Sequence, residues 1–410
     1  MSVRIAVTGM GVISPIGNDV DTFWQSLVAG KSGVSILDRF PIDKLRTDVA
    51  AVVRDFDIGD AMDEKEKSLH GRVTKMLVGA ASQALRQAAL PESYDRDRVG
   101  VLLGPGQAPV ELLDENFAKV AERGVRVVSP FFVPTVMPNA AAALVSIRHQ
   151  FRGPNFSLAS ACATGVHSLA VGAMMILTGE ADAMVVGGGE AAIVPSCVAA
   201  FGNARALARS IEGDATRASR PYDTGRNGFV MGEGAGALVL EREDLARARG
   251  ATIYGLLSGW GMSGDAEHIV RPHPEGRGVA LAVKAALKRA EITPEQLGYI
   301  NPHATSTPQG DIAEYSALRA SLGDSLSKTP VSATKSILGH LLGGAGAVES
   351  IATVLSLHHG VAHPSLNLDN KDPIFELDIV TSARELKIQH ALKTSAGFGG
   401  HNAALVFSRP

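Results

Sequence analysis

The chain has 410 residues, of which 45% are hydrophobic and 20% charged, and its formal net charge is −3. This composition supports a large buried core, and the charge excludes the basic excess that a nucleic-acid partner favours. We find no run near the roughly 20 apolar residues of a membrane span, and the N-terminus lacks the apolar segment of a signal peptide. With two cysteines and no CxxC pair, we expect a cytoplasmic protein without a zinc or redox centre.

Short apolar runs alternate along the chain with segments of helical length. The runs have the length of buried strands, and they span 5–9, 99–104, 183–187, 236–240, 254–258 and 403–407. The predicted helices span 74–89, 164–178, 278–290, 311–321 and 345–358. This alternation predicts an α/β fold with helices covering the sheets. The segment 262–276 is rich in glycine, proline and charge, and we expect it to form a surface loop between two halves, roughly 1–250 and 251–410.

Two glycine patterns resemble nucleotide-binding motifs without completing them. Gly9-Met10-Gly11 follows a predicted strand, but Ser14 occupies the position where a dinucleotide fingerprint has its third glycine. Gly30-Lys31-Ser32 resembles the end of a P-loop, but Gln25 occupies the position of the first glycine of that motif. We therefore assign no nucleotide site.

Cys162 lies where an extended run passes into a helix of small residues, within 157–165. Free backbone N–H groups and the positive end of the helix dipole at this position are expected to lower the thiol pKa and favour the thiolate. The alternative is that Cys162 is a small buried hydrophobic residue, as free cysteine often is. For Cys197, which lies in an apolar run, that structural role is the preferred interpretation.

Two histidines lie on loops of small residues in the second half of the chain. His303 follows a predicted strand and precedes a threonine-rich turn, and His340 ends a segment that also contains Lys335. Lys335 and Glu349 both lie in largely apolar stretches. If they are buried they should pair, because an isolated buried charge is very costly.

The segment 395–402 is a glycine-rich turn before the last predicted strand. Such a turn can present backbone N–H groups to a developing oxyanion. Phe398 is the only bulky side chain in it before His401, and a ring between glycines could swing. The alternative is an ordinary turn with one core aromatic residue.

Together these segments resemble the β-ketoacyl-acyl-carrier-protein synthases of the elongating type II group. The similarity extends along the whole chain, and further familiar stretches are 7–11, 129–134, 219–223 and 228–236. The resemblance implies a thiolase-like fold, with two related halves in stacked helix and sheet layers, and a homodimer. It also implies elongation of fatty acids by decarboxylative Claisen condensation. No free cofactor is implied, because acyl carrier protein brings both acyl and malonyl groups on its phosphopantetheine arm.

Catalytic roles follow from the resemblance by position. In the N-terminal half, Cys162 would attack the acyl thioester and hold the growing chain. In the C-terminal half, His303 and His340 would bind the malonyl thioester carbonyl and stabilise the enolate left by decarboxylation. The N–H groups of Cys162 and Phe398 would form the oxyanion hole, and Lys335, paired with Glu349, would organise the site.

Substrate-binding roles follow in the same way. Thr305 and Thr307 would bind the phosphopantetheine arm, and Phe398 would be the gate between the two half-reactions. Phe201 would line the acyl pocket, and Phe132 would reach the pocket of the partner subunit.

Two further sites are implied by the resemblance. Asn301 and Glu349 would help to hold a structural monovalent cation, Na⁺ or K⁺, as in some relatives. The carrier protein of this family is acidic, so basic side chains could steer it to the enzyme. The candidates for this docking patch are Lys65, Lys67, Arg72, Lys75, Arg205 and Arg209.

Four positions depart from the pattern of the family. Ala304 replaces a glycine after the first histidine, and Ala396 replaces a phenylalanine beside the gate. Gln107 replaces an aliphatic residue that helps to set acyl-chain length, and Val270 replaces a threonine that binds pantetheine. These departures keep open a specialised synthase for polyketides or modified fatty acids, with the same chemistry.

Three other interpretations fit the residues less well. A non-catalytic chain-length partner subunit would lack the nucleophile, which is present as Cys162. A degradative thiolase would need a second cysteine near the C-terminus, and none follows Cys197. A synthase that starts chains from acyl-CoA typically has a histidine and an asparagine beside its cysteine, whereas this chain has His303 and His340.

Overall fold

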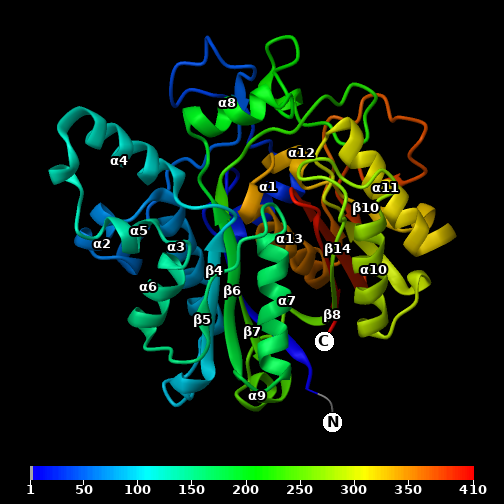
Figure 1. Ribbon diagram of the computed structural model, residues 1–410. Coiled ribbons are helices and arrows are strands. Elements are labelled where there is room, and N and C mark those ends of the chain that lie inside the picture. The colour runs from blue at the N-terminus through cyan, green and yellow to red at the C-terminus, as the bar shows by residue number, and fades with distance from the viewer. Residues whose placement is uncertain (1–2) are drawn as a thin grey trace.

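In the computed structural model, which describes residues 3–410, one 11-stranded sheet runs through the protein (Figure 1). Its strand order is β12-β10-β9-β14-β15-β8-β1-β7-β6-β4-β5. These strands span β1 (Ile5–Ile13), β4 (Val99–Pro105), β5 (Asn155–Phe156), β6 (Ala183–Glu190), β7 (Gly234–Arg242), β8 (Gly255–Gly264), β9 (Leu297–Asn301), β10 (Pro330–Val331), β12 (Asp378–Ile379), β14 (His390–Gly397) and β15 (His401–Ser408). Short separate pairs are β2 (Ser35–Ile36) with β3 (Val49–Ala50), and β11 (Val361–Ala362) with β13 (Arg384–Glu385).

Helices cover the outer faces of this sheet, and two of them lie between its N-terminal and C-terminal halves. They are α1 (Val20–Val28), α2 (Glu64–Leu69), α3 (Arg72–Ala88), α4 (Val110–Arg123), α5 (Phe132–Val136), α6 (Ala140–His149), α7 (Thr164–Leu177), α8 (Pro195–Asn203), α9 (Glu243–Ala248), α10 (Arg277–Ala290), α11 (Pro308–Leu322), α12 (Lys335–Leu338) and α13 (Ala345–His359).

The sheet repeats one pairing pattern twice. In the N-terminal half-sheet, β1 is antiparallel to β7 and β7 to β6, whereas β6, β4 and β5 are mutually parallel. In the C-terminal half-sheet, β8 is antiparallel to β15 and β15 to β14, whereas β14, β9 and β10 are mutually parallel. The halves join where β1 meets β8, at Ala6↔Leu256 and Val7↔Gly255.

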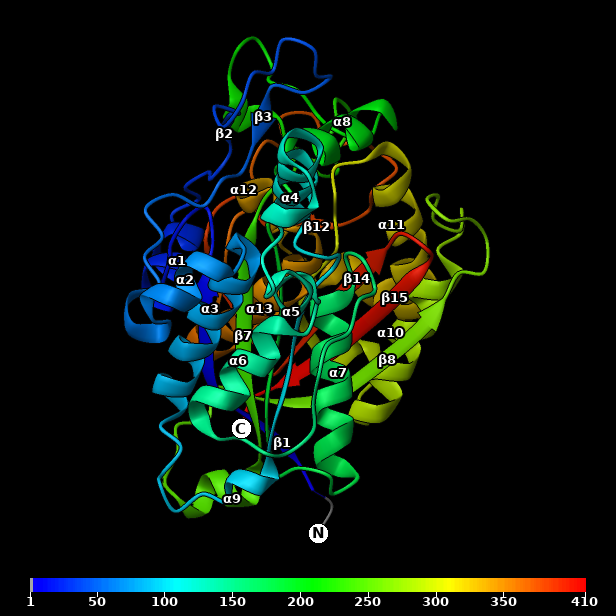
Figure 2. The ribbon, with the colours of Figure 1, turned by 60° about the vertical axis from the view of Figure 1, so that its left-hand side comes forward.

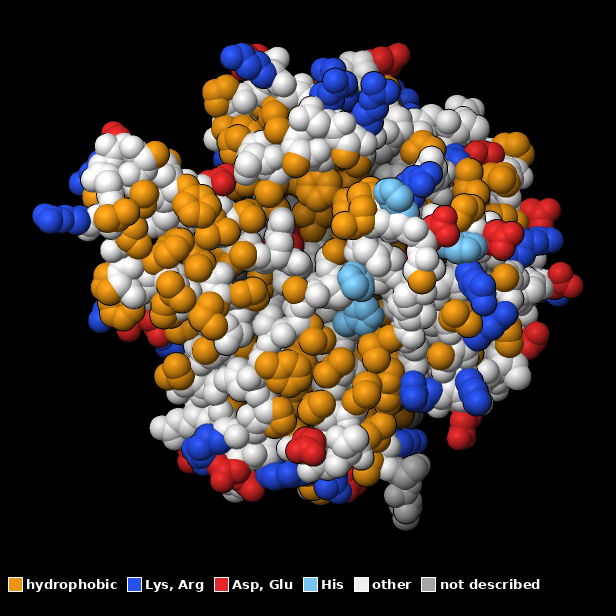
Figure 3. All heavy atoms as spheres, in the orientation of Figure 1, with side chains coloured by type: hydrophobic (Ala, Val, Ile, Leu, Met, Phe, Trp, Pro, Cys, Tyr) orange, Lys and Arg blue, Asp and Glu red, His pale blue; other side chains and the backbone are white. Residues whose placement is uncertain are grey.

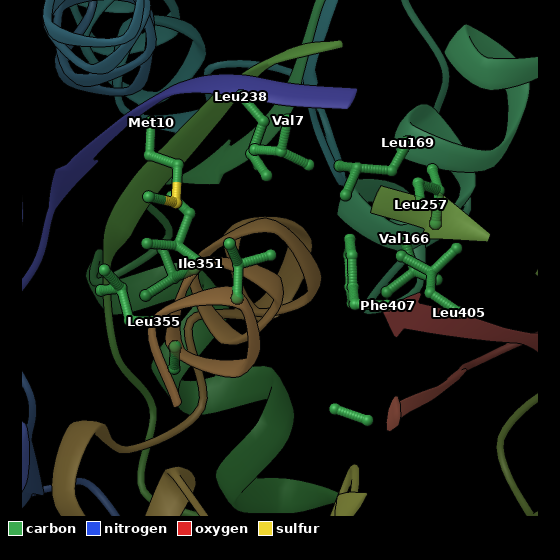
Figure 4. Packing of buried hydrophobic residues seen from close by; sticks show 14 of the residues in the cluster. Val7, Met10, Val166, Leu169, Leu238, Leu257, Ile351, Leu355, Leu405 and Phe407 are labelled. Carbon is green, nitrogen blue, oxygen red and sulfur yellow. The ribbon is translucent and has the colours of Figure 1, made fainter. Parts of the chain in front are cut away.

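Helices and half-sheets stack in alternating layers (Figures 1 and 2). Helices α3 and α6 cover one face of the N-terminal half-sheet, and α10 and α11 lie against the outer face of the C-terminal half-sheet. The helices α7 and α13 pack against each other between the two half-sheets. Figure 4 shows this central core, where Val166 of α7, Ile351 of α13 and Phe407 of β15 are buried. Burial between two sheets explains the apolar and small-residue composition of α7 and α13.

Glycines in β1 and β8, the two strands that join the half-sheets, allow helices to pack unusually close to the sheet. A Cβ added at Gly9 or Gly11 of β1 would lie 2.1 or 1.9 Å from a carbonyl oxygen of α3. A Cβ added at Gly259 or Gly261 of β8 would lie 2.2 or 2.0 Å from a carbonyl oxygen of α10. The Gly-x-Gly pattern that resembled a nucleotide motif is therefore a helix-packing device, and both halves use it.

The predicted strands and helices are confirmed, with ends shifted by a few residues. The segment 262–276 is a surface loop only from residue 265 onward, because its first residues belong to β8, whose pairing with β15 continues to Gly264↔His401. The remaining residues form a loop that leads into α10 within the C-terminal half. Among the described residues, no helix has the length and apolarity to cross a membrane.

Candidate active site

A cavity of about 430 Å³ lies between the loop that precedes α7 in the N-terminal half and several loops of the C-terminal half. It collects most of the side chains singled out in the sequence, together with the variant positions Val270 and Ala396. The predicted site residues that line it are Cys162, Phe201, His303, Thr305, Thr307, His340 and Phe398. Arg205 and Arg271 also line it.

Cys162 is held just before the start of α7 by a strained turn. Ala161 has a φ of 49°, in the left-handed region that favours glycine. A Cβ added at Gly397 would lie 3.2 Å from the backbone nitrogen of Cys162, so the end of β14 closely approaches the nucleophile loop. The Ser395 hydroxyl of β14 donates to the Cys162 carbonyl at 3.1 Å. Strand β14 therefore fixes the loop that carries the thiol.

Burial governs the acidity of this thiol. It raises the pKa of Cys162 to about 12, against the lowering effect of the Lys335 ammonium and of the backbone N–H groups of Phe398 and Cys162. The prediction of a lowered thiol pKa was therefore wrong, because desolvation of the thiolate outweighs the favourable dipoles. The backbone N–H groups of Phe398 and Cys162 lie close enough to the thiol to favour its thiolate, which makes them candidates for an oxyanion hole.

Hydrogen bonds fix the tautomer of both cavity histidines. The backbone N–H of Leu342 donates to Nδ1 of His340 at 3.3 Å, and Nζ of Lys335 lies 3.4 Å from Nδ1 of His303. Because a backbone N–H and an ammonium can only donate, Nδ1 is the acceptor in both rings. Each imidazole therefore carries its proton on Nε2. The two ring centroids are 5.2 Å apart, which suits two donors to one small acceptor.

Both imidazoles are kept neutral. Burial and then the nearby Lys335 ammonium lower the pKa of His303 and of His340 well below 6.5. His303 also faces His340, and both face Lys393, which lower the pKa further. Two neutral N–H donors in a buried cavity can stabilise a negative charge that develops on a bound carbonyl oxygen.

A buried ionic group supports His303 from behind the cavity. Lys335, which begins α12, donates to Glu349 Oε1 of α13 at 2.5 Å, as the cost of burying either charge alone required. Lys393 of β14 contacts the other carboxylate oxygen, Oε2, at 2.6 Å. All three side chains are at most 2% exposed. Burial lowers the pKa of Lys393 to about 8, despite the attraction of Glu349.

Two buried acids of α11 hold the loop that carries His303, and sequence reasoning missed both. Glu314 accepts the backbone N–H groups of His303 and Ala304, each at 2.7 Å. Asp311 accepts the N–H of Ser306 at 3.0 Å, and burial raises the pKa of Asp311 to about 7. The available signal was a pair of acids three residues apart on one helix, directly after the threonine-rich turn.

The other predicted binding residues are arranged around the cavity. The hydroxyl groups of Thr305 and Thr307 lie 2.9 Å apart. The ring of Phe398 is 36% exposed and lies 5.9 Å from the ring of Phe201. Gly399, which follows it, has a φ of 84°, and its N–H donates to Ile269 at 2.7 Å. The loop of Phe398 is thus tied to the segment before α10.

Some predicted site residues do not line this cavity. Glu349 and Lys335 lie behind His303, and Phe132 is in α5. Gln107 and Ser196 lie close enough to Cys197 to influence the pKa of its thiol, so Cys197 does have polar neighbours.

Two members of the expected docking patch are engaged in ion pairs. Arg72 pairs at 2.8 Å with the buried Glu233, which also binds Arg39. Lys67 pairs with Glu64 at 2.7 Å. The charge of Arg72 is thus largely balanced, although its side chain is 34% exposed, and its part in carrier docking stays a prediction.

Comparisons with known proteins agree with this geometry. Family models described as the N-terminal and C-terminal domains of beta-ketoacyl synthase match residues 2–246 and 254–369. A Vibrio harveyi protein named 3-oxoacyl-[acyl-carrier-protein] synthase 2 is 44% identical over 409 residues, covering 99% of this chain and 98% of that protein. A Coxiella burnetii protein of the same name is 42% identical, with the same coverage.

A solved type II polyketide ketosynthase, in complex with its acyl-carrier protein and bound to a hexaketide, is 29% identical. The match covers 100% of both chains with a TM-score of 0.93. The fold is thiolase-like, as the resemblance implied. The chain belongs to the β-ketoacyl synthase family of condensing acyltransferases.

Proposed function

We propose that the chain is an elongating β-ketoacyl-acyl-carrier-protein synthase of fatty-acid synthesis. It would join an acyl chain held on Cys162 to malonyl-carrier protein by decarboxylative Claisen condensation. The observation that carries this proposal is the convergence of three features in one cavity. These are the thiol, two imidazoles with Nε2–H groups, and two backbone N–H groups close to the thiol. The phosphopantetheine arm of the carrier supplies both thioesters, and no free cofactor takes part.

The first half-reaction transfers the acyl chain. The sulfur of Cys162 attacks the carbonyl carbon of the acyl thioester, and the N–H groups of Cys162 and Phe398 stabilise the oxyanion. The bond to the pantetheine sulfur then breaks, and the proton of Cys162 ends on that leaving thiol. Because the pKa of Cys162 is about 12 in the free protein, this proton leaves during the attack rather than before it.

The second half-reaction forms the carbon–carbon bond. The thioester oxygen of the malonyl group accepts hydrogen bonds from Nε2–H of His303 and His340. Its carboxylate leaves as CO₂, and the electron pair forms an enolate that these two donors stabilise. The enolate carbon attacks the acyl carbonyl on Cys162, the carbon–sulfur bond breaks, and the released thiolate takes a proton from solvent. The product is a β-ketoacyl-carrier protein.

Binding of the carrier and its arm involves the rim of the cavity. Thr305 and Thr307 offer hydroxyl groups to the arm, and Phe398 separates the two half-reactions as a gate. The Phe201 ring belongs to the apolar cluster around Cys162, which suits an acyl chain. The exposed Arg205 at the cavity mouth offers a positive charge to an acidic carrier protein.

A homodimer is part of this proposal. Figure 3 shows hydrophobic side chains gathered over α4, α5 and α6, at the left of the view. Exposed apolar residues of this region are Phe117, Val125, Phe131, Val133, Met137 and Ile147. An apolar surface of this kind marks an interface, and a second copy would bring its own Phe132 to the pocket of its partner. We place the enzyme in the cytoplasm, where its two unpaired cysteines stay reduced.

Intact-protein mass spectrometry tests the function. The protein is incubated with acyl- and malonyl-carrier protein, alongside the variants Cys162→Ala and Cys197→Ala. We expect wild type and Cys197→Ala to carry the acyl mass and release β-ketoacyl-carrier protein, and Cys162→Ala to do neither. Product from Cys162→Ala would contradict the assignment of the nucleophile. Absence of product from acylated wild type would exclude malonyl extension.

A specialised synthase for polyketides or modified fatty acids is the second candidate. Two observations favour it: Ala396 lines the cavity where a phenylalanine is usual, and Gln107 places a polar group beside the apolar cluster around Cys162. The acyl-chain profile on Cys162 separates the candidates. Loading of saturated medium and long chains alone would reject the specialised synthase, and a preference for oxidised or unsaturated chains would support it.

A further inference from the structure

Lys393 is a fully buried cation in the middle of β14 that the catalytic proposal does not use. Its side chain is 0% exposed, and its neighbours in sequence, Leu392 and Thr394, are also buried. Three oxygen atoms surround its ammonium. They are Oε2 of Glu349 at 2.6 Å, the backbone carbonyl of Thr394, and the carbonyl of Pro302 at 3.5 Å.

These oxygen atoms are the kind that a hard monovalent ion prefers, and the sequence led us to expect Na⁺ or K⁺ beside Asn301 and Glu349. The residues present do not fit such an ion. Both oxygen atoms of Glu349 are already engaged, one by Lys335 and one by Lys393. A third positive charge at this carboxylate would be repelled by two ammonium groups that already contact it.

The side chain of Asn301 indicates, independently, that a cation could bind here once the ammonium of Lys393 is absent. It is 0% exposed, and its amide nitrogen donates to Thr334 Oγ1 at 2.9 Å. Its Oδ1 has no hydrogen-bond partner within residues 3–410. A buried amide oxygen without a partner is costly, and it is available as an additional ligand if the ammonium of Lys393 is removed.

We propose that the ammonium of Lys393 is a covalently tethered replacement for a structural monovalent cation. It acts as a positioning residue. By neutralising Glu349 it allows this carboxylate to hold Lys335, whose Nζ lies 3.4 Å from Nδ1 of His303. The same strand continues to Ser395, which binds the carbonyl of Cys162. Lys393 thereby helps to position both His303, through Glu349 and Lys335, and Cys162, through strand β14. The wild-type enzyme therefore needs no added Na⁺ or K⁺.

The direct test is anomalous diffraction from crystals grown in thallium(I) acetate. For wild type we expect no anomalous peak within about 4 Å of Glu349, the distance at which two charges still interact strongly. For Lys393→Ala we expect a peak between the Glu349 carboxylate and the carbonyl of Thr394. A thallium peak on Glu349 in wild type, or no peak there in crystals of the variant, would overturn the proposal. The wild-type measurement decides even if Lys393→Ala does not fold.

A second test separates a cation site from a merely structural lysine. Melting temperature and malonyl decarboxylation are measured in potassium chloride and in choline chloride at equal ionic strength. Lys393→Ala should melt several degrees higher and react at least ten-fold faster in potassium, because ion binding stabilises only the folded state. Wild type should not distinguish the salts, and neither should Lys387→Ala, which removes an exposed lysine.

Equal losses for Lys393→Ala in both salts would contradict the proposal, because a lost ion pair does not depend on which cation is present. Melting temperature and thallium binding do not depend on the reaction. If the wild-type enzyme does not decarboxylate malonyl-carrier protein, the proposed function is rejected. Melting temperature and thallium binding then still decide whether Lys393 replaces a cation.

Discussion

The two halves of the molecule share a scaffold and differ in chemistry. Both have the same order of strands, both pack a helix against a Gly-x-Gly strand, and both send one helix into the central layer. The N-terminal half supplies the thiol of Cys162 at the start of α7. The C-terminal half supplies His303 and His340, with Phe398 on the turn after β14. The repeated architecture therefore positions the site, and the loops at equivalent ends of the halves determine what each contributes.

Two buried glutamates, one in each half, have different environments. Glu190, at the end of β6 in the N-terminal half, accepts backbone N–H groups and has a pKa raised by burial to about 8, so it is neutral at pH 7. Glu349 in the C-terminal half is bound by two ammonium groups. The contrast is local to these two residues, because Glu233 of the N-terminal half is also held by two cations, and burial raises the pKa of Asp311 of the C-terminal half to about 7.

The largest effect that distinguishes the halves should come from the histidines. His303→Ala or His340→Ala removes one donor to the enolate, and we expect condensation to fall by about 100- to 1000-fold. The rate of β-ketoacyl product formation measures this loss. The control is His358→Ala, an exposed residue at the end of α13, which should retain wild-type activity. Losses below about ten-fold, the lower limit for an essential donor, would contradict the role of the histidines.

The next largest effect should come from substitutions where the two central helices, α7 and α13, cross. A Cβ at Gly165 of α7 would lie 2.3 Å from the backbone nitrogen of Ala347, and one at Gly346 of α13 would lie 2.7 Å from that of Val166. We expect Gly165→Ala to lower the free energy of unfolding by about 3 kcal/mol and Gly346→Ala by somewhat less. Denaturant titration measures both. Gly264→Ala serves as the control, because its nearest atom is 4.0 Å away. Three equal free energies would refute the close crossing.

The pH dependence of decarboxylation should be weaker than for ordinary histidines. Since burial lowers the pKa of His303 and His340 well below 6.5, both rings stay neutral as the pH falls through 6.5. We expect the rate to change less than about two-fold between about pH 7.5 and 5.5, whereas a requirement for a neutral ring of ordinary pKa would cost about ten-fold. An inflection near 6.5 in the pH profile of malonyl decarboxylation would show that these rings titrate normally.

The smallest effect concerns the turn after His303. Ala304 has a φ of 36°, where a side chain is strained. Ala304→Gly should relieve about 1 kcal/mol of strain, and the greater freedom of glycine in the unfolded chain offsets most of it. We therefore expect a change in the free energy of unfolding below about 1 kcal/mol, measured by denaturant titration, with unchanged activity. A loss above about 2 kcal/mol would mean that the Ala304 methyl group contributes packing.

Much of this organisation was predictable from the sequence, because strand and helix periodicities are local. The apolar runs were recognised from this periodicity. The pairing of Lys335 with Glu349 followed from the cost of burying either charge alone. The repeat of the halves was predicted only through the family resemblance, because no periodicity along the chain indicated it. The thiol pKa of Cys162 could not be predicted either, because it depends on how completely distant segments exclude water. Lys393 did leave a signal, a lysine within a largely buried segment, but its partner became clear only in three dimensions.

The most direct test of the division between the halves measures the two half-reactions separately. Acyl transfer is followed by the mass of the protein, and decarboxylation by release of CO₂ from malonyl-carrier protein. We expect Cys162→Ala to lose acyl transfer and retain decarboxylation, and His303→Ala to retain acyl transfer and lose decarboxylation. If His303→Ala lost acyl transfer as fully as decarboxylation, the two halves would not supply separate chemistry, and the account would be wrong.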